Sequence, residues 1–269
     1  MATHSPAVHL GLATASLSIV LVTAGGVPVG AGGPDPAAPA HPLATARFPT
    51  GVMPTAVTST SAPTTDPAPV PDTLGLGDSG PAVLALQERL TALGYWLGTP
   101  DGSYGLLTQQ AAIALQGTAG IARDGVVGPN THAALDAGIR PTARSTTGAV
   151  TEIDRDTGVI IFARDGDVQL VLHTSTGTFE TYYHEGRQLL ADTPEGQFTV
   201  TWAHDGWRDG ALGQLYRPRY FHPDGIAVHG YPSVPAYPAS HGCARVTNAA
   251  IDMVWASDLM PIGSEVWVY

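Results

Sequence analysis

The stretch YPASHGCARVTN, residues 237–248, contains the only cysteine of this 269-residue chain, Cys243. His241 precedes it by two positions, and a second histidine, His229, lies upstream in the segment GIAVHGY. A cysteine is an effective nucleophile when its thiolate is stabilised and a base lies within reach, and histidines and backbone amides usually supply both. The stretch therefore predicts a nucleophilic cysteine and a domain built to use one.

The surroundings of the two histidines predict different roles for them. In GIAVHGY the apolar run is typical of a strand that ends in a turn at Gly230, so His229 would stand at a strand end. The other histidine belongs to the sequence HGC around Gly242, directly before a helical pattern. The backbone N–H groups of that turn could hold a developing oxyanion.

Two other interpretations compete with a nucleophile. A solitary cysteine is most often a small buried hydrophobe, and unpaired histidines are most often surface or core residues with satisfied nitrogens. A metal site built from His222, His229, His241 and Cys243 is an alternative, but the spacing fits no common structural zinc pattern. An exported protein rarely keeps a free thiol unless that thiol has a chemical function. We therefore favour the nucleophile and predict neither a metal nor a cofactor.

The composition narrows the classes of partner. The twelve basic residues are all arginine and the formal net charge is −11, so nothing supports binding to nucleic acid or to an anionic membrane surface. The chain is longer than a typical domain of about 100–200 residues, which favours two modules plus unstructured segments. A single cysteine rules out an internal disulfide but not secretion.

The first part of the chain predicts export. Residues 1–30 contain an uncharged apolar run, LGLATASLSIVLVTA, followed by small residues, which is typical of a signal peptide. An uncleaved anchor in the lipid bilayer is the alternative, because no Arg or Lys precedes the run. Residues 31–72 are rich in Pro, Ala and Thr and predict a disordered linker. We expect a secreted, extracytoplasmic protein.

Residues 73–138 predict a small module of three helices. Apolar residues recur at helical spacing through LQERLTALGY, Pro81 stands where a first helical turn tolerates it, and Gly94 can end that helix. Two later segments, DGSYGLLT and DGVVGPNT, share the pattern D-G-x-x-G-x-x-T, and each leads into an alanine-rich helical stretch. Asp-Gly turns and a threonine in N-cap position explain this repeat without a ligand.

These elements resemble the peptidoglycan-binding domain that accompanies many cell-wall hydrolases and transpeptidases. GDSG, LQERLTALGY, DGSYG and DGVVGPNTHAAL follow one another in the order of that family. The resemblance implies that the module binds peptidoglycan, through its glycan or its peptide, and that the protein works at the cell wall.

Residues 139–148 predict a second linker, and residues 149–269 predict a mainly β domain. Short runs of β-branched residues alternate with turn sequences such as DRDTG and RDGD, and the final run, EVWVY, is typical of a closing strand. Only NAAIDMVWASDL, directly after the cysteine segment, shows helical periodicity in this half.

This second half resembles the L,D-transpeptidase family, whose catalytic domain is of the YkuD type. The family signature, an H-G pair followed after a gap by S-H-G-C-x-R, is met by His229-Gly230 and by the run from Ser240 to Arg245, with Ala244 where the family usually has a larger aliphatic residue. Upstream, HTSTG and TPEGQF match two further family elements in the expected order. The resemblance implies a YkuD-like β-sandwich, so the expected fold is a two-domain arrangement of a three-helix binding domain and a mainly β catalytic domain.

The same resemblance implies a mechanism. Cys243 would attack the carbonyl before the terminal D-alanine of a tetrapeptide stem and hold the stem as a thioester, which an amine of a neighbouring stem would convert into a 3-3 cross-link. His229, oriented by the Gly230 carbonyl, would move the protons. Carbapenem-type inhibitors would acylate the same thiol. The remaining signature residues would form the oxyanion site and the pocket: Ser240, His241, Gly242 and Arg245.

Other functions remain open at this point. With water in place of the acceptor amine the same residues would make an L,D-carboxypeptidase, and a domain that has lost activity would leave a non-catalytic peptidoglycan-binding protein. Arg245 fits a structural salt bridge as well as it fits an orienting residue or a contact to a substrate carboxylate.

Overall fold

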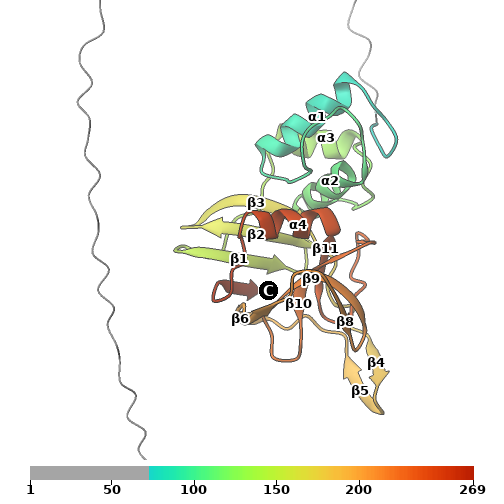
Figure 1. Cartoon of the computed structure of the whole chain (residues 1–269). Helices are drawn as coiled ribbons and strands as arrows, with labels where there is room; N and C mark the ends of the chain where they lie inside the picture. Colours follow the sequence, from blue (N-terminus) through green and yellow to red (C-terminus); the bar gives the residue numbers. More distant parts are fainter. Residues whose placement is uncertain (1–72) are drawn as a thin grey trace, which may run out of the picture. The chain divides into compact units, whose positions relative to one another are not determined.

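The computed structural model describes residues 73–269, which belong to one compact unit (Figure 1). The signal peptide and the linker predicted for residues 1–30 and 31–72 lie outside the described residues. No helix within residues 73–269 has the length and the apolar character that a membrane crossing requires.

Three helices precede the first strand of the described chain: α1 (Pro81–Ala92), α2 (Leu106–Thr118) and α3 (Pro129–Asp136). Each follows a glycine at its N-cap, and a proline opens α1 and α3, where its missing N–H breaks no helical hydrogen bond. The remaining helix of this part of the chain, α4 (Asn248–Ala256), directly follows the cysteine segment.

The two D-G-x-x-G-x-x-T segments are held by equivalent buried glutamines, one on the helix before each segment. Gln87 of α1 donates to the aspartate of the first segment and to Thr108 Oγ1, and Gln116 of α2 donates in the same way to the aspartate of the second segment and to Thr131 Oγ1. The prediction of threonine N-caps was wrong, because both N-caps are glycines without a side-chain hydrogen bond. The two threonines lie one turn later and accept from the glutamines.

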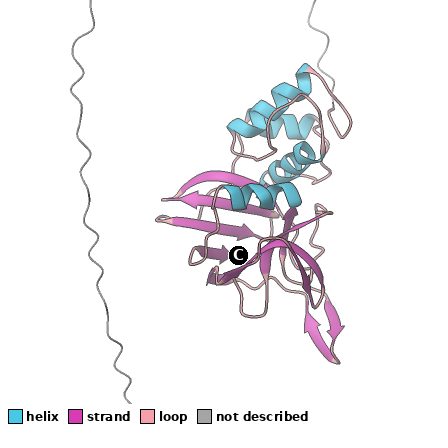
Figure 2. Ribbon diagram, viewed as in Figure 1, coloured by secondary structure: helices cyan, strands magenta, loops and turns pink. Residues whose placement is uncertain are grey.

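The rest of the described chain contains two five-stranded sheets and a hairpin (Figure 2). In the first sheet, ordered β3-β2-β1-β12-β6, only β1 and β12 are parallel. Its strands are β1 (Ala149–Asp154), β2 (Val159–Arg164), β3 (Asp167–His173), β6 (Gly196–Thr199) and β12 (Glu265–Val268).

The second sheet has the order β11-β10-β9-β7, with β8 paired to β9, and its β10 and β11 are parallel. Its strands are β7 (Trp202–Ala203), β8 (Trp207–Gly210), β9 (Gly213–Tyr220), β10 (Ala227–Tyr231) and β11 (Ala244–Thr247). The hairpin pairs β4 (Thr181–His184) with β5 (Arg187–Leu190).

The two sheets and α4 share one hydrophobic core. Ile160 and Phe162 of β2, Val228 of β10, Val246 of β11 and Ile251 of α4 all lie in a single cluster of buried side chains. Because side chains alternate between the two faces of a strand, β2 turns one of its faces towards this core. The mainly β half expected from the sequence is therefore present, with its two sheets on either side of a common core.

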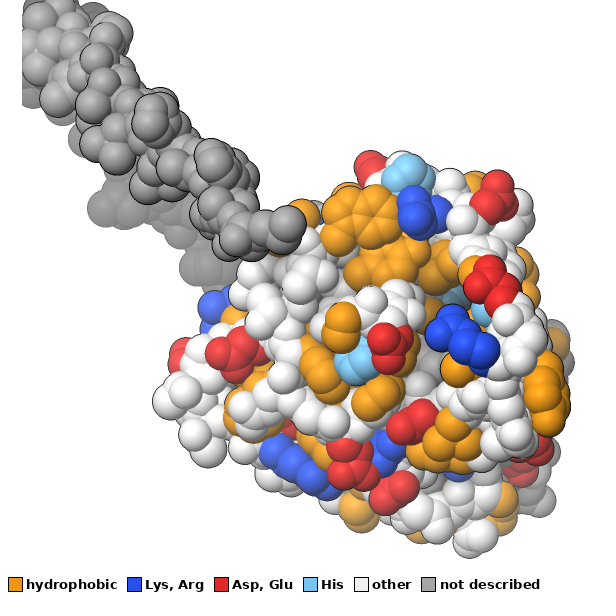
Figure 3. Space-filling model, turned by 90° about the horizontal axis from the view of Figure 1, so that it is seen from below, with side chains coloured by type: hydrophobic (Ala, Val, Ile, Leu, Met, Phe, Trp, Pro, Cys, Tyr) orange, Lys and Arg blue, Asp and Glu red, His pale blue; other side chains and the backbone are white. Residues whose placement is uncertain are grey.

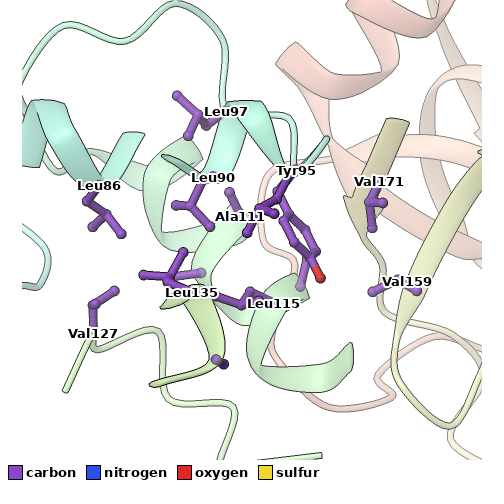
Figure 4. Packing of buried hydrophobic residues seen from close by; sticks show 14 of the residues in the cluster. Leu86, Leu90, Tyr95, Leu97, Ala111, Leu115, Val127, Leu135, Val159 and Val171 are labelled. Carbon is purple, nitrogen blue, oxygen red and sulfur yellow. The ribbon is translucent and has the colours of Figure 1, made fainter. Parts of the chain in front are cut away.

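The other face of β2 is buried by the helices. Val159, Ile161 and Ala163 alternate with the residues just named, and they lie in a second cluster together with side chains such as Leu90 of α1 and Leu115 of α2 (Figure 4). A strand that is buried on both faces needs a covering layer on each side. The helices and the first sheet therefore share a core instead of having one each.

Backbone hydrogen bonds reinforce this contact at the outer edge of β3. The Val171 N–H donates to the Gly94 carbonyl over 2.9 Å, and the Val171 carbonyl accepts from the Trp96 N–H over 3.1 Å. Tyr95, between these two residues, is fully buried and forms a parallel bridge with Val171. The segment after α1 thus extends the first sheet by a short additional pairing.

The segment predicted as a second linker, residues 139–148, is bonded to the β half. Arg140 donates to the Val168 carbonyl over 2.8 Å, and Ser145 donates to the Glu152 carboxylate from its N–H (2.8 Å) and from its hydroxyl (2.6 Å). Burial acts to raise the pKa of Glu152, but hydrogen bonds, including those from Ser145, outweigh it and lower that pKa. The segment is a fixed connection and not a free spacer.

Candidate active site

The parallel pairing of β10 with β11 brings the segments that carry His229 and Cys243 next to each other. His229 is the partner of Arg245 in the register, and Val228 is the partner of Ala244. Cys243 directly precedes the first residue of β11, and its Sγ lies 4.0 Å from the Gly225 carbonyl oxygen, just before β10. The pairing of the two strands therefore brings together segments that were predicted from separate motifs.

The environment of His229 determines its tautomer. The side chain is 3% exposed, and its Nδ1 lies 2.9 Å from the Gly230 carbonyl oxygen. A carbonyl can only accept, so Nδ1 carries the proton and Nε2 presents a lone pair. Burial, aided by the charge of Arg245, lowers the pKa of His229 to about 4. At neutral pH the imidazole is therefore an uncharged base, oriented by the carbonyl that follows it.

The thiol of Cys243 is uncharged in the resting state as well. Its side chain is partly exposed, and burial raises its pKa, although a hydrogen bond from the Ala227 backbone and the charge of Arg245 act in the opposite direction. The sequence favoured a stabilised thiolate, whereas in the structure both the thiol and the nearby imidazole are neutral. A thiol in this state needs a base to take its proton before it can act as a nucleophile.

We expect the rate of Cys243 acylation to hold down to about pH 4. Below its pKa of about 4 His229 is protonated at Nε2 and cannot accept the thiol proton, whereas a histidine with the ordinary pKa of 6.5 would lose this capacity much earlier. The measurement is the second-order rate constant of acylation by a carbapenem between about pH 3.5 and pH 8, on protein that circular dichroism shows to be folded. We expect this rate constant to fall only on the acid side, near pH 4. An acid limb near pH 6.5 would contradict a buried neutral base.

The turn before Cys243 is held by Ser240. The buried Ser240 hydroxyl donates to the Cys243 carbonyl over 2.6 Å and accepts from the Gly242 N–H over 3.0 Å. The Cys243 N–H, in contrast, has no hydrogen-bond acceptor within residues 73–269. The sequence expected the amides of Gly242 and Cys243 to serve an oxyanion, and in this arrangement only the Cys243 amide is free to do so.

The other two signature residues lie on opposite sides of this turn. His241 is exposed and packs edge-on against Tyr182 of the hairpin, with ring centroids 4.7 Å apart. Arg245 donates to the Ala239 carbonyl over 2.9 Å and places its guanidinium over the Tyr231 ring at 4.3 Å. Within the described chain Arg245 forms no salt bridge, and its charge acts to lower the pKa of His229.

The hydrogen bonds that fix the loop between β10 and Ser240, residues 232–239, were not predicted from the sequence. Its three prolines have no N–H group to donate to the rest of the protein. Four side chains from outside the loop form hydrogen bonds with its carbonyl groups and fix its position. One of these four side chains, Gln110, belongs to α2. A pocket of about 320 Å³ lies between α2 and the loop and is lined by residues of both. The bonds run from Gln110 to Val234, His173 to Pro235, Ser175 to Tyr237 and Arg245 to Ala239, over 2.8–3.1 Å.

The arrangement of metal-ligating and charged side chains can be followed in the part of the chain that the structure describes. Within residues 73–269 no three side chains of His, Cys, Asp or Glu lie close enough to hold a metal ion, and His222 instead accepts a hydrogen bond from the Asp224 N–H. On the face shown in Figure 3, basic and acidic side chains are interspersed and no broad basic area is visible.

Comparisons with known proteins identify relatives of both halves of the described chain. The model of a putative peptidoglycan binding domain matches residues 79–135, and that of the L,D-transpeptidase catalytic domain (YkuD) matches residues 149–268. Among curated proteins, the N-acetylmuramoyl-L-alanine amidase CwlL of Bacillus licheniformis is 45% identical over 86 residues, which are 31% of this chain and 24% of that protein. A probable N-acetylmuramoyl-L-alanine amidase of the same organism is 49% identical over 63 residues, 23% of this chain and 18% of that protein. The chain thus spans about a quarter or less of these relatives.

A solved structure covers far more of the chain. The L,D-transpeptidase of Xylanimonas cellulosilytica, in its crystal structure of residues 123–326, is 50% identical to this chain, with a TM-score of 0.72. The match covers 76% of this chain and 100% of that one, so it includes both the helices and the sheets. Half of the residues are identical over the whole of that structure, and the matched catalytic domain confirms the resemblance seen in the motifs. This chain therefore belongs to the L,D-transpeptidase family.

Proposed function

We propose that the protein forms 3-3 cross-links between peptidoglycan stem peptides through a thioester on Cys243. The observation that carries the proposal is the pairing of β10 with β11, which brings the Cys243 segment next to His229, a neutral imidazole whose Nδ1–H is held by the Gly230 carbonyl. A positioned neutral base beside a partly exposed thiol is the arrangement that acyl transfer requires.

In the first half-reaction Cys243 Sγ attacks the carbonyl between the third stem residue and the terminal D-alanine, and His229 Nε2 takes the thiol proton. The Cys243 N–H, free of protein acceptors, stabilises the negative charge on the carbonyl oxygen. When the tetrahedral intermediate collapses, His229 returns the proton to the leaving amine, D-alanine departs, and the stem remains as a thioester. The proton of the thiol therefore ends on the amine of the released D-alanine.

In the second half-reaction an amine on the third residue of a neighbouring stem attacks the thioester. His229 takes a proton from that amine and gives it to the departing Cys243 sulfur, which restores the neutral pair. The module proposed for residues 73–138 would hold the polymer close to the catalytic domain proposed for residues 149–269. Under this proposal the segment 1–30 exports the protein, which acts at the cell wall.

Hydrolysis is the competing reaction, because Cys243 is partly exposed and His241 beside it is exposed, so water has access to the thioester. We expect purified protein incubated with disaccharide-tetrapeptide to give cross-linked dimers and free D-alanine in mass spectrometry. Tripeptide product without dimers would identify an L,D-carboxypeptidase, and unchanged substrate would indicate a non-catalytic binding protein.

Replacement of His229 by alanine is expected to lower the rate of D-alanine release by about a hundredfold or more, the usual loss for a positioned acid-base group. The control is His241→Ala, which removes an exposed imidazole of the same loop and should lower turnover far less, with the pH dependence of thiol alkylation unchanged. A larger loss in the His241 variant than in the His229 variant would reverse the assignment of the base.

A further inference from the structure

The peptide unit between Gly242 and Cys243 is held by a threonine from a distant segment. Thr193 is fully buried, and its hydroxyl lies 2.7 Å from the Gly242 carbonyl and 2.9 Å from the Gly177 N–H. The Gly177 N–H can only donate and the Gly242 carbonyl can only accept. The single hydroxyl proton of Thr193 therefore points at Gly242, and both bonds are satisfied in one arrangement only.

A fixed carbonyl also fixes the amide on the other side of the same peptide bond. The described chain has no cis peptide bonds, and in a planar trans peptide the C=O and the N–H point in opposite directions. While Thr193 holds the Gly242 oxygen, the Cys243 N–H must point away from the buried threonine. This N–H is the one that lacks an acceptor within residues 73–269.

Close backbone packing prevents the threonine segment from shifting. A Cβ on Gly242 would lie 2.6 Å from the Asp192 carbonyl oxygen, and a Cβ on Gly177 would lie 2.3 Å from that of Ala191. Both glycines are therefore required, because they let the segment around Thr193 approach the turn to backbone contact. Arg155 secures the segment from the other side by donating to the Thr193 carbonyl over 2.9 Å.

We propose that Thr193 is a positioning residue that aims the Cys243 N–H at the oxyanion formed when Cys243 is acylated. The inference rests on the proposed acyl transfer, but not on the identity of the acyl donor. Thr193 itself does not contact the reacting atoms, since it lies below the turn and is closed off from solvent.

The test compares two reactions of the same thiol in the full-length protein. Acylation by p-nitrophenyl acetate passes through a tetrahedral oxyanion, whereas alkylation by iodoacetamide does not. Thr193→Val keeps the shape and removes the hydroxyl, and we expect acylation to fall about tenfold to a hundredfold, somewhat less than for deletion of an oxyanion donor. Alkylation should stay within about twofold of the wild-type rate, because no oxyanion forms.

Two further variants make the result decisive. Thr193→Ser restores the hydroxyl and should recover acylation, and Thr201→Val, at an exposed threonine further along the chain, should change neither rate. If valine prevents folding, Thr193→Ala removes the same hydroxyl with less bulk. Parallel losses of acylation and alkylation, a serine variant as impaired as the valine variant, or unchanged acylation in the valine variant would each overturn the proposal. Failure of the wild-type protein to release D-alanine from stems would count against the proposed substrate and leave this comparison interpretable.

Discussion

Cys243→Ala is expected to abolish both D-alanine release and the covalent adduct that a carbapenem leaves on the protein. Cys243 is the only cysteine of the chain, so no second thiol can replace it. Intact-protein mass spectrometry should find one adduct on the wild-type protein and none on the variant. An adduct of equal mass on the alanine variant would show that another residue is the nucleophile.

The serine variant tests the same assignment more sharply. His229, with a pKa of about 4, is a weak base, and a serine hydroxyl is far less acidic than a thiol. Cys243→Ser should therefore be nearly inactive although its side chain has almost the same shape. Binding of both variants to insoluble peptidoglycan should match the wild type, which separates loss of chemistry from loss of substrate binding.

Removal of the helices is expected to unfold the catalytic half. A fragment of residues 149–269 would expose the side of β2 and β3 that carries Val159, Ile161 and Val171, each at most 1% exposed in the intact protein. Burial of these three side chains stabilises the fold by about 4.5–9 kcal/mol at about 1.5–3 kcal/mol each. A domain has only about 5–15 kcal/mol of net stability, so this loss is decisive.

The matched control for that fragment is residues 73–269, which keeps both layers around β2. We expect this control to unfold cooperatively in thermal denaturation and to react with a carbapenem, whereas the shorter fragment should aggregate or lack a cooperative transition. Cooperative unfolding of the shorter fragment near the temperature of the control would show that the first sheet does not depend on the helices.

The local patterns of the sequence were sufficient to predict the strands and to select His229 and Cys243 as the candidate catalytic pair. The run from Val159 to Ala163 is continuously apolar, which is typical of a strand buried on both faces. This pattern indicates that a second layer, here the helices, packs on the face of the strand opposite the common core of the two sheets. His229 and Cys243 could be paired because each belongs to a recognisable motif.

Contacts between distant segments could not be predicted in this way. Thr193 and Gly242 are 49 residues apart, and Gln110 and Val234 are 124 residues apart, so no local spacing relates them. The element TPEGQF was recognised as a family motif, but the role of its threonine depends on the packing of two glycines against one backbone segment. The acidity of the thiol also depends on burial, and for that reason its direction of shift differed from the sequence-based expectation.

The neutral resting state of the thiol has a consequence for the chemical lifetime of the enzyme. Peroxides and related oxidants attack the thiolate, and oxidation beyond the sulfenic acid is irreversible for most proteins. Since burial raises the pKa of Cys243, only a small fraction of the resting sulfur is in the reactive form. For the exported enzyme proposed above, which would meet oxidants without the reducing systems of the cytosol, this would keep the single thiol intact between turnovers.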